Sequence, residues 1–299
     1  MKGNVIVGQS GGPTAAINSS LAGVYRTAID RGAPKVYGML HGIEGLLNEQ
    51  YIDLSEHIET DLDVELLKRT PKTIDNDLAL TDHTPGYGSA AKYIGTSTKE
   101  IIQDSSALVY SKGLVTIVEI MGRNAGWLTG AAALSAGEDC EGPDLIYLPE
   151  VAFDIEDFLS RVKKLLEKKP FVIAAVSEGI RLEDGRYVCE LTDGVDFVDA
   201  FGHKQLTGTA NYLARRLSQE IGCKTRSIEL SSLQRAASHL ASRIDILEAF
   251  QVGGAAVKAA DEGDTGEMVI LKRISDDPYQ CTTELRNVHK AVSYTHLTL

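Results

Sequence analysis

The sequence predicts an α/β protein in which strands alternate with helices and most sheets are parallel. Short apolar runs, at 114–120 and 171–176, alternate along the chain with longer amphipathic segments such as 155–168. This order is typical of βαβ units. A second observation is the length of 299 residues, which suffices for two domains or one large α/β unit.

Composition and charge exclude several classes of protein. The hydrophobic content of 43% and the charged content of 24% are ordinary for a globular protein. A formal charge of −12 argues against broad nucleic-acid binding and against an anionic membrane surface. We find no signal-peptide core and no apolar run of membrane-spanning length. The four cysteines form no CxxC pair, so we expect neither a zinc site nor disulfides, and a cytoplasmic location fits.

The N-terminal quarter reads as a strand, a glycine turn and a helix. The predicted strand covers 4–8, the turn contains Gly11 and Gly12, and the helix covers 15–31. Such a turn can bind phosphate through backbone N–H groups at the helix N-terminus, although a plain tight turn is the alternative. A strand at 35–39, a loop or short helix at 42–48 and a polar helix at 62–69 follow.

The stretch 71–77 concentrates charged and polar groups. Asp75 and Asp77 alternate, so in an extended segment both carboxylates point to one side. Two carboxylates suit a divalent cation, or a base beside a metal ligand, and Lys72 suits a phosphate. An Asx-rich turn is the alternative interpretation. No strand precedes this stretch, although catalytic loops of α/β sheets usually follow strands.

The rest of the chain continues the alternation. We predict strands at 114–120, 145–148, 171–176, 224–230 and 267–271, a hairpin at 182–191, and helices at 89–103, 125–136, 155–168, 205–221 and 244–262. The pair Gly253-Gly254 allows close helix packing. Arg123 lies between a strand end and a helix start, where a substrate phosphate can bind, although a surface-loop arginine remains open as an alternative, and Glu178 occupies the same position after another strand.

Together these motifs closely resemble the phosphofructokinase family. The matching residues are Gly11-Gly12, Thr73 to Asp77, Met121-Gly122-Arg123, Glu178-Gly179 and the pair Arg226 and Arg235, in the family's order and over the chain to about Val288. The resemblance implies two Rossmann-like three-layer α/β domains facing each other across a cleft. Lys72 stands where ATP-dependent members carry glycine, so the chain resembles the pyrophosphate-dependent type.

The resemblance also implies a reaction of glycolysis and residue roles. Pyrophosphate would phosphorylate the 1-hydroxyl of fructose 6-phosphate, with Mg²⁺ as cofactor. Asp75 would be the base, Asp77 would assist at the metal and phosphoryl group, and Lys72 would stabilise charge on pyrophosphate. Thr73, Met121, Gly122, Arg123, Glu178, Arg235 and a neighbouring subunit's Arg226 would bind the sugar phosphate, Gly11 and Gly12 would contact the donor, and a homo-oligomer, dimer or tetramer, is implied.

The sequence departs from the family at two places. The family's second Gly-rich donor loop is absent, and several dozen residues, including a core strand, are missing between Thr70 and Pro71. The tail 291–299 differs from the family's closing helix. We expect a donor domain at 1–88 plus 236–290, a sugar-phosphate domain at 89–235 and an irregular tail. The alternatives are an ATP-dependent 6-phosphofructokinase and an inactive or truncated relative.

Overall fold

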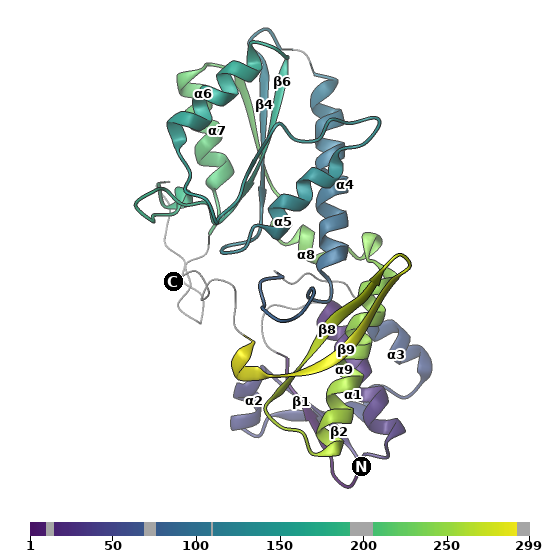
Figure 1. Ribbon diagram of the computed structural model, residues 1–299. Helices are drawn as coiled ribbons and strands as arrows, with labels where there is room; N and C mark the ends of the chain where they lie inside the picture. Colours follow the sequence, from purple (N-terminus) through teal and green to yellow (C-terminus); the bar gives the residue numbers. More distant parts are fainter. Residues whose placement is uncertain (10–14, 69–75, 109, 192–205, 292–299) are drawn as a thin grey trace. The chain divides into compact units, whose positions relative to one another are not determined.

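A computed structural model describes residues 1–9, 15–68, 76–108, 110–191 and 206–291. The chain forms two compact units (Figure 1). Unit 1 comprises Met1–Ala90 and Arg235–Leu299, and unit 2 comprises Ala91–Gln234. The chain enters unit 2 within helix α4 (Tyr87–Ser106) and leaves it within helix α8 (Leu233–Ala236). Which unit binds which substrate stays a prediction.

Unit 2 is built on a four-stranded parallel sheet with the order β5-β6-β4-β7. These strands are β5 (Leu145–Tyr147), β6 (Phe171–Ser177), β4 (Leu114–Ile120) and β7 (Lys224–Glu229). β4 and β6 run in register from Leu114 opposite Phe171 to Ile120 opposite Ser177. Every residue of β4 is buried, because helices cover both faces of the sheet. The predictions of these four strands are confirmed to within about a residue at each end.

Helices complete the three layers of unit 2. On one face, α6 (Ile155–Leu166) and α7 (Thr209–Glu220) pack on β4 and β6 around Phe158 and Leu213, and α4 lies on the other face (Figure 1). α6 begins at Asp154, whose side chain accepts the N–H groups of Glu156 and Asp157. In the α4 layer, Ser105 contacts Thr116 of β4 at 3.2 Å.

Two predictions in unit 2 need correction. The helix expected at 125–136 is divided into α5 (Trp127–Gly130) and a 3₁₀ turn (Ala131–Ser135), because Gly126 and Gly130 favour helix ends over helix interiors. The hairpin expected at 182–191 is reduced to a single bridge between Arg181 and Tyr187. Beyond this bridge, a 3₁₀ turn (Val188–Leu191) buries Val188 in the core instead of continuing a strand.

Unit 1 is organised around two closely packed helices, α1 (Ala15–Asp30) and α9 (Arg243–Glu262). A Cβ atom built on Gly23 would lie 2.0 Å from the carbonyl oxygen of Phe250, and one built on Gly253 would lie 2.0 Å from that of Ser20. Only glycine permits this approach. The prediction that the glycine pair of α9 allows close packing is therefore confirmed.

A small mixed sheet lies beside these helices. β1 (Val5–Val7) pairs in parallel with β2 (Val36–Met39), and β2 pairs antiparallel with β3 (Tyr51–Asp53). Helices α2 (Ile43–Leu47) and α3 (Asp61–Lys68) complete this part. β3 was not predicted, because two of its three residues are exposed and it carries no apolar run.

The C-terminal part of unit 1 is a two-stranded ribbon, β8 (Glu267–Asp276) with β9 (Tyr279–Asn287). The last strand was predicted at 267–271. β8 is longer than this prediction, and β9 was not predicted. Most residues of both strands are exposed or only partly buried, and their polar and charged residues hide the pattern of a buried strand. The tail predicted to be irregular lies, from 292 onward, outside the described residues.

The outer edge of β1 is open in the part of the chain that the structure describes, since β1 pairs there with β2 alone. A pocket of about 320 Å³ lies in unit 1 beside β1 and α1. Its apolar lining includes Val7, Leu21, Val252 and Val269. No helix among the described residues is both long and apolar enough to cross a membrane.

Candidate active site

The ends of β4 and β6 bring the predicted sugar-binding residues of unit 2 together. The N–H of Gly122 donates to Oε1 of Glu178 at 3.3 Å, and the N–H of Glu178 donates to the carbonyl of Ile120 at 2.9 Å. Gly122 has a φ of +144°, and a Cβ there would lie 2.6 Å from the carbonyl oxygen of Ala125. This loop therefore requires glycine at 122.

Ser177 and Gly179 lock the same loop in place. The Ser177 hydroxyl donates to the carbonyl of Gly122 at 2.6 Å and accepts the N–H of Gly179 at 3.0 Å. A Cβ on Gly179 would lie 2.0 Å from the carbonyl oxygen of Arg123. The backbone of Arg123 is thus set against Gly179, so both predicted motifs share one rigid turn.

Gln234 supports the loop from a distant part of the sequence. Its Oε1 accepts the N–H of Met121 at 3.2 Å, and the side chain is 2% exposed. Sequence reasoning missed Gln234, since a lone glutamine carries no motif. It directly precedes the predicted phosphate ligand Arg235, which is partly exposed in α8.

Glu119 is a buried carboxyl group that sequence reasoning also missed. It is 4% exposed on β4, and its Oε2 accepts the N–H of Ala210 at 2.8 Å. Burial raises the pKa of Glu119 to about 7, and the nearby carboxylates of Glu229 and Glu178 add to this rise. A glutamate within an otherwise apolar run was the signal that could have identified it.

Arg226 is not brought together with the residues at the strand ends. It lies on β7 opposite Thr116, before the carboxyl end of the sheet, and pairs with Asp104 of α4 at 2.5 Å. Its predicted role in a neighbouring subunit's site stays a prediction.

The predicted catalytic stretch is described only in part. Lys72, Thr73 and Asp75, like Gly11 and Gly12, lie outside the described residues. Asn76 has a φ of +59°, and its Oδ1 accepts the N–H of Thr84 at 2.8 Å. Asp77 follows it and is partly buried. The positive φ and the side-chain hydrogen bond of Asn76 are typical of the Asx turn that was the alternative interpretation, since asparagine tolerates the left-handed region. Such a turn does not exclude a catalytic role for the neighbouring residues.

A metal centre is not assigned to the described residues. His83, Asp245 and Glu248 bring potential ligand atoms within 4.8 Å of one another. However, protein donors already engage the two carboxylates: Asp245 accepts the N–H groups of Gly86 and Ser89, at 3.1 and 2.5 Å, and Glu248 contacts His83. This donor set also fits Mg²⁺ poorly, because Mg²⁺ prefers oxygen ligands and bound water.

Comparisons with known proteins agree with these motifs. Residues 67–260 match the family model described as Phosphofructokinase. A pyrophosphate--fructose 6-phosphate 1-phosphotransferase of Halomonas elongata is 34% identical over 351 residues, covering 94% of this chain and 82% of that protein. A pyrophosphate-dependent phosphofructokinase structure from Marinobacter aquaeolei has a TM-score of 0.82 and 30% identity, covering 97% of this chain and 83% of that one.

The alignments also measure what this chain lacks. The 351 positions aligned with the Halomonas elongata protein contain 94% of 299 residues, or about 281, so about 70 positions have no counterpart here. A relative from Dictyoglomus thermophilum, 36% identical, aligns over 203 residues with 68% of the chain, also about 203, so it needs essentially no gap. The missing positions therefore lie together, outside the part of the chain that aligns with this second relative. By motif order, family match and structure, the chain belongs to the phosphofructokinase family.

Proposed function

We propose that this chain transfers a phosphoryl group from pyrophosphate to the 1-hydroxyl of fructose 6-phosphate, which yields fructose 1,6-bisphosphate. The main support comes from relatives that are more than 30% identical and align with more than 90% of the chain, because these relatives are named for this activity. Lys72 supports pyrophosphate as the donor, because it stands where ATP-dependent members of the family carry glycine, and its ammonium group can neutralise phosphate charge.

The proposed roles divide between the two units. In unit 2, Met121, Gly122, Arg123 and Glu178 bind the sugar at the ends of β4 and β6. Arg235, with Arg226 from a neighbouring subunit, binds the 6-phosphate. In unit 1, Asp75 takes the proton of the 1-hydroxyl, Lys72 and Asp77 face the transferring phosphoryl group, Thr73 contacts the sugar phosphate, and Gly11 and Gly12 contact the donor. Phosphoryl transfer depends mainly on such positioning and charge neutralisation.

Mg²⁺ is the proposed cofactor, with Asp75 and Asp77 as candidate ligands. Carboxylate oxygens suit this ion, and Asp77 is only partly buried, so its carboxylate could reach a bound cation. When bound, Mg²⁺ would neutralise charge on the phosphates. We further propose a glycolytic role, a cytoplasmic location and a homo-oligomer.

A donor assay tests the proposal. Purified chain is incubated with Mg²⁺, fructose 6-phosphate and either pyrophosphate or ATP, and fructose 1,6-bisphosphate is measured. We expect product with pyrophosphate; product with ATP alone would contradict the role of Lys72. Lys72→Gly should raise the KM for pyrophosphate far more than that for the sugar. An equal rise in both KM values would contradict the assigned role.

The second candidate is a sugar-binding relative that does not transfer phosphate. The roughly 70 positions absent relative to the Halomonas elongata protein favour it, because a donor loop is among the expected losses. Thermal unfolding separates the two. A native-state ligand raises the unfolding midpoint, so a rise with fructose 6-phosphate, combined with no product from either donor, would identify this second function.

A further inference from the structure

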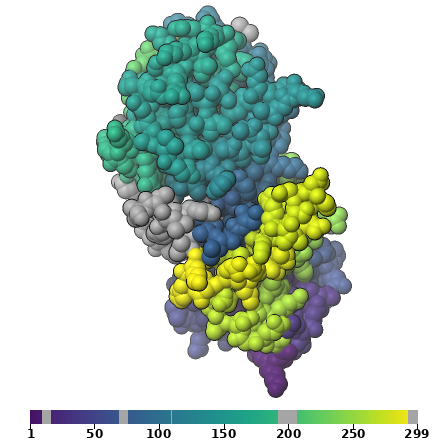
Figure 2. Space-filling model, viewed as in Figure 1, coloured from purple at the N-terminus to yellow at the C-terminus, as the bar shows by residue number. Residues whose placement is uncertain are grey.

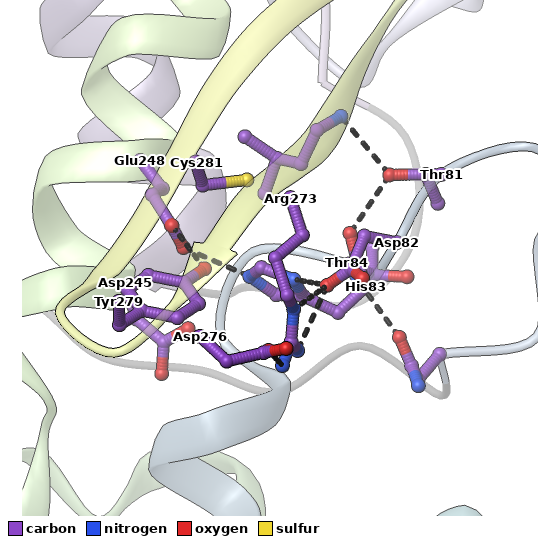
Figure 3. A network of polar contacts seen from close by, with 12 residues as sticks. Thr81, Asp82, His83, Thr84, Asp245, Glu248, Arg273, Asp276, Tyr279 and Cys281 are labelled. Atoms are coloured by element: carbon purple, nitrogen blue, oxygen red, sulfur yellow. Dashed lines mark hydrogen bonds and ion pairs between the residues drawn. The ribbon is translucent and has the colours of Figure 1, made fainter.

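The segment 76–84, which continues the predicted catalytic stretch, is held by a polar network centred on His83 (Figure 3). Nδ1 of His83 lies 2.8 Å from Oδ2 of Asp82, and Nε2 lies 2.8 Å from Oε2 of Glu248 in α9. Ionised carboxylates only accept hydrogen bonds. When both carboxylates are ionised, both ring nitrogens donate, and His83 is then an imidazolium ion between them.

The groups around His83 favour its charged form. From α9 come Glu248, which is 3% exposed, and Asp245. From β9 comes Tyr279, whose hydroxyl donates to Oε1 of Glu248 at 2.6 Å, with Cys281 beside it (Figure 3). Burial opposes the charge on His83, but its hydrogen bonds to Glu248 and Asp82 outweigh this effect and raise the pKa of His83 above its usual value.

β8 contributes the remaining charges. Arg273 donates to Oδ2 of Asp82 at 3.0 and 3.2 Å and to Asp276 at 3.0 Å. If His83 were neutral, Glu248 would lose its cationic partner, and Asp82 would share a single guanidinium with Asp276. Protonation of His83 thus improves the local charge balance.

Hydrogen bonds that involve main-chain groups also join this segment to β8 of unit 1. The N–H of Asp82 donates to the carbonyl of Leu271 at 2.9 Å, and the N–H of Leu271 donates to the Thr81 hydroxyl at 3.1 Å. The N–H of Thr84 then reaches Oδ1 of Asn76 at 2.8 Å. Figure 2 shows this blue segment at the surface beside the yellow ribbon of β8 and β9. The turn is closed at both ends, and Asp77 lies within it.

We propose that His83 is a positioning residue, which in its protonated form fixes the segment 76–84 against α9 and the β8–β9 ribbon and so holds Asn76 and Asp77 for phosphoryl transfer. The catalytic part of this proposal rests on the proposed function. The anchoring part does not, since it follows from the hydrogen bonds alone.

Hydrogen exchange tests the anchoring without any activity. In His83→Gln, the amide side chain carries no charge, and it cannot donate from both ends as the imidazolium does, because one end is a carbonyl oxygen that only accepts. We expect amides of 76–84 to exchange about tenfold faster or more, because the hydrogen bonds between charged groups that hold this segment are lost. Amides of α1 and β2 should be unchanged. The matched control is His57→Gln, at an exposed histidine elsewhere in unit 1. Equal acceleration throughout unit 1 would overturn the proposal.

A pH series separates the ion pair from simple packing. Protection factors of 76–84 in the unmodified protein should fall as the pH rises through the raised pKa of His83. Glu248→Gln removes one carboxylate, so the same fall should occur at lower pH. In His83→Gln the dependence should vanish. Its persistence in that variant would contradict His83 as the titrating group.

Kinetics then tests the link to catalysis. In His83→Gln we expect kcat with pyrophosphate to fall about tenfold or more, while the KM for fructose 6-phosphate changes less than about twofold, because the proposed sugar contacts at β4 and β6 lie in unit 2. An unchanged kcat would refute positioning. If the unmodified protein forms no product, the proposed function fails, and the exchange results still decide whether His83 anchors the segment.

Discussion

Replacing Glu119 by glutamine should remove a large pH dependence from the stability of unit 2. Glu119 is 4% exposed on the central strand β4, and its pKa is raised to about 7 from an ordinary value of 4.5. Burial is the main cause, followed by the carboxylates of Glu229 and Glu178. The N–H of Ala210 partly offsets these effects, since it donates to the carboxylate.

The magnitude follows from the difference between the folded and unfolded pKa values. About 2.5 pKa units at about 1.36 kcal/mol each give a contribution on the order of 3 kcal/mol. A raised pKa in the folded state means that the folded protein binds the proton more tightly. The stabilisation is therefore fully present below about pH 4.5 and is lost as the pH rises through about 7.

Urea unfolding monitored by fluorescence measures this effect. Trp127 is the single tryptophan of the chain and lies in unit 2, so it reports on the relevant unit. Between pH 5 and 8, Glu119→Gln should lose less stability than the unmodified protein by on the order of 2–3 kcal/mol. Glu141→Gln, at an exposed position, is the control. Identical pH slopes in the unmodified protein and Glu119→Gln would refute the reasoning.

Three further predictions concern packing and capping. Gly179→Ala would place a Cβ 2.0 Å from the carbonyl oxygen of Arg123. We therefore expect the free energy of unfolding in urea to fall by about 1–3 kcal/mol and fructose 6-phosphate to bind more weakly in calorimetry. Unchanged binding would contradict the role of this turn. Gly253→Ala should force α1 and α9 apart and lower the thermal midpoint, whereas Gly263→Ala, with open space around its Cβ but a φ of +97°, should act only through local backbone strain. Asp154→Ala should destabilise α6 by about 1 kcal/mol, and Asp154→Asn should restore most of this loss, because asparagine also caps helices.

The strands that the sequence predicts best are those buried on both faces. β4 and β6 are mainly apolar runs, since helices cover both sides of a parallel sheet, and such runs are recognised without knowledge of their partners. β9 was missed because its exposed face gives it a polar sequence, and its pairing with β8 depends on a neighbour rather than on its own pattern.

The candidate site divides in the same way. Glycine and charged residues directly after strands could be identified, because parallel strands end at one edge of the sheet. The residues that hold these side chains and loops in place could not be identified from the sequence. Gln234 contacts Met121 from 113 positions away, and Glu248 contacts His83 from 165 positions away. Contacts over such separations follow from the packing of the units and leave no local motif.

Unit 2 and unit 1 differ in how complete their sheets are, and this difference bears on function. In unit 2, β4 and β6 are each paired on both edges, and the loop of Met121, Gly122 and Glu178 is internally bonded. In unit 1, β1 has one open edge among the described residues, and an apolar pocket of about 320 Å³ lies beside it. A paired strand at that edge would satisfy the backbone groups that β1 leaves unpaired there. This chain lacks about 70 of the positions in its alignment with the Halomonas elongata protein. From the order of the family motifs, we expect the missing segment directly before Pro71. We therefore expect loss of the segment to impair phosphoryl transfer more than sugar binding, because the broken sheet belongs to the unit that carries Asp75 and Asp77.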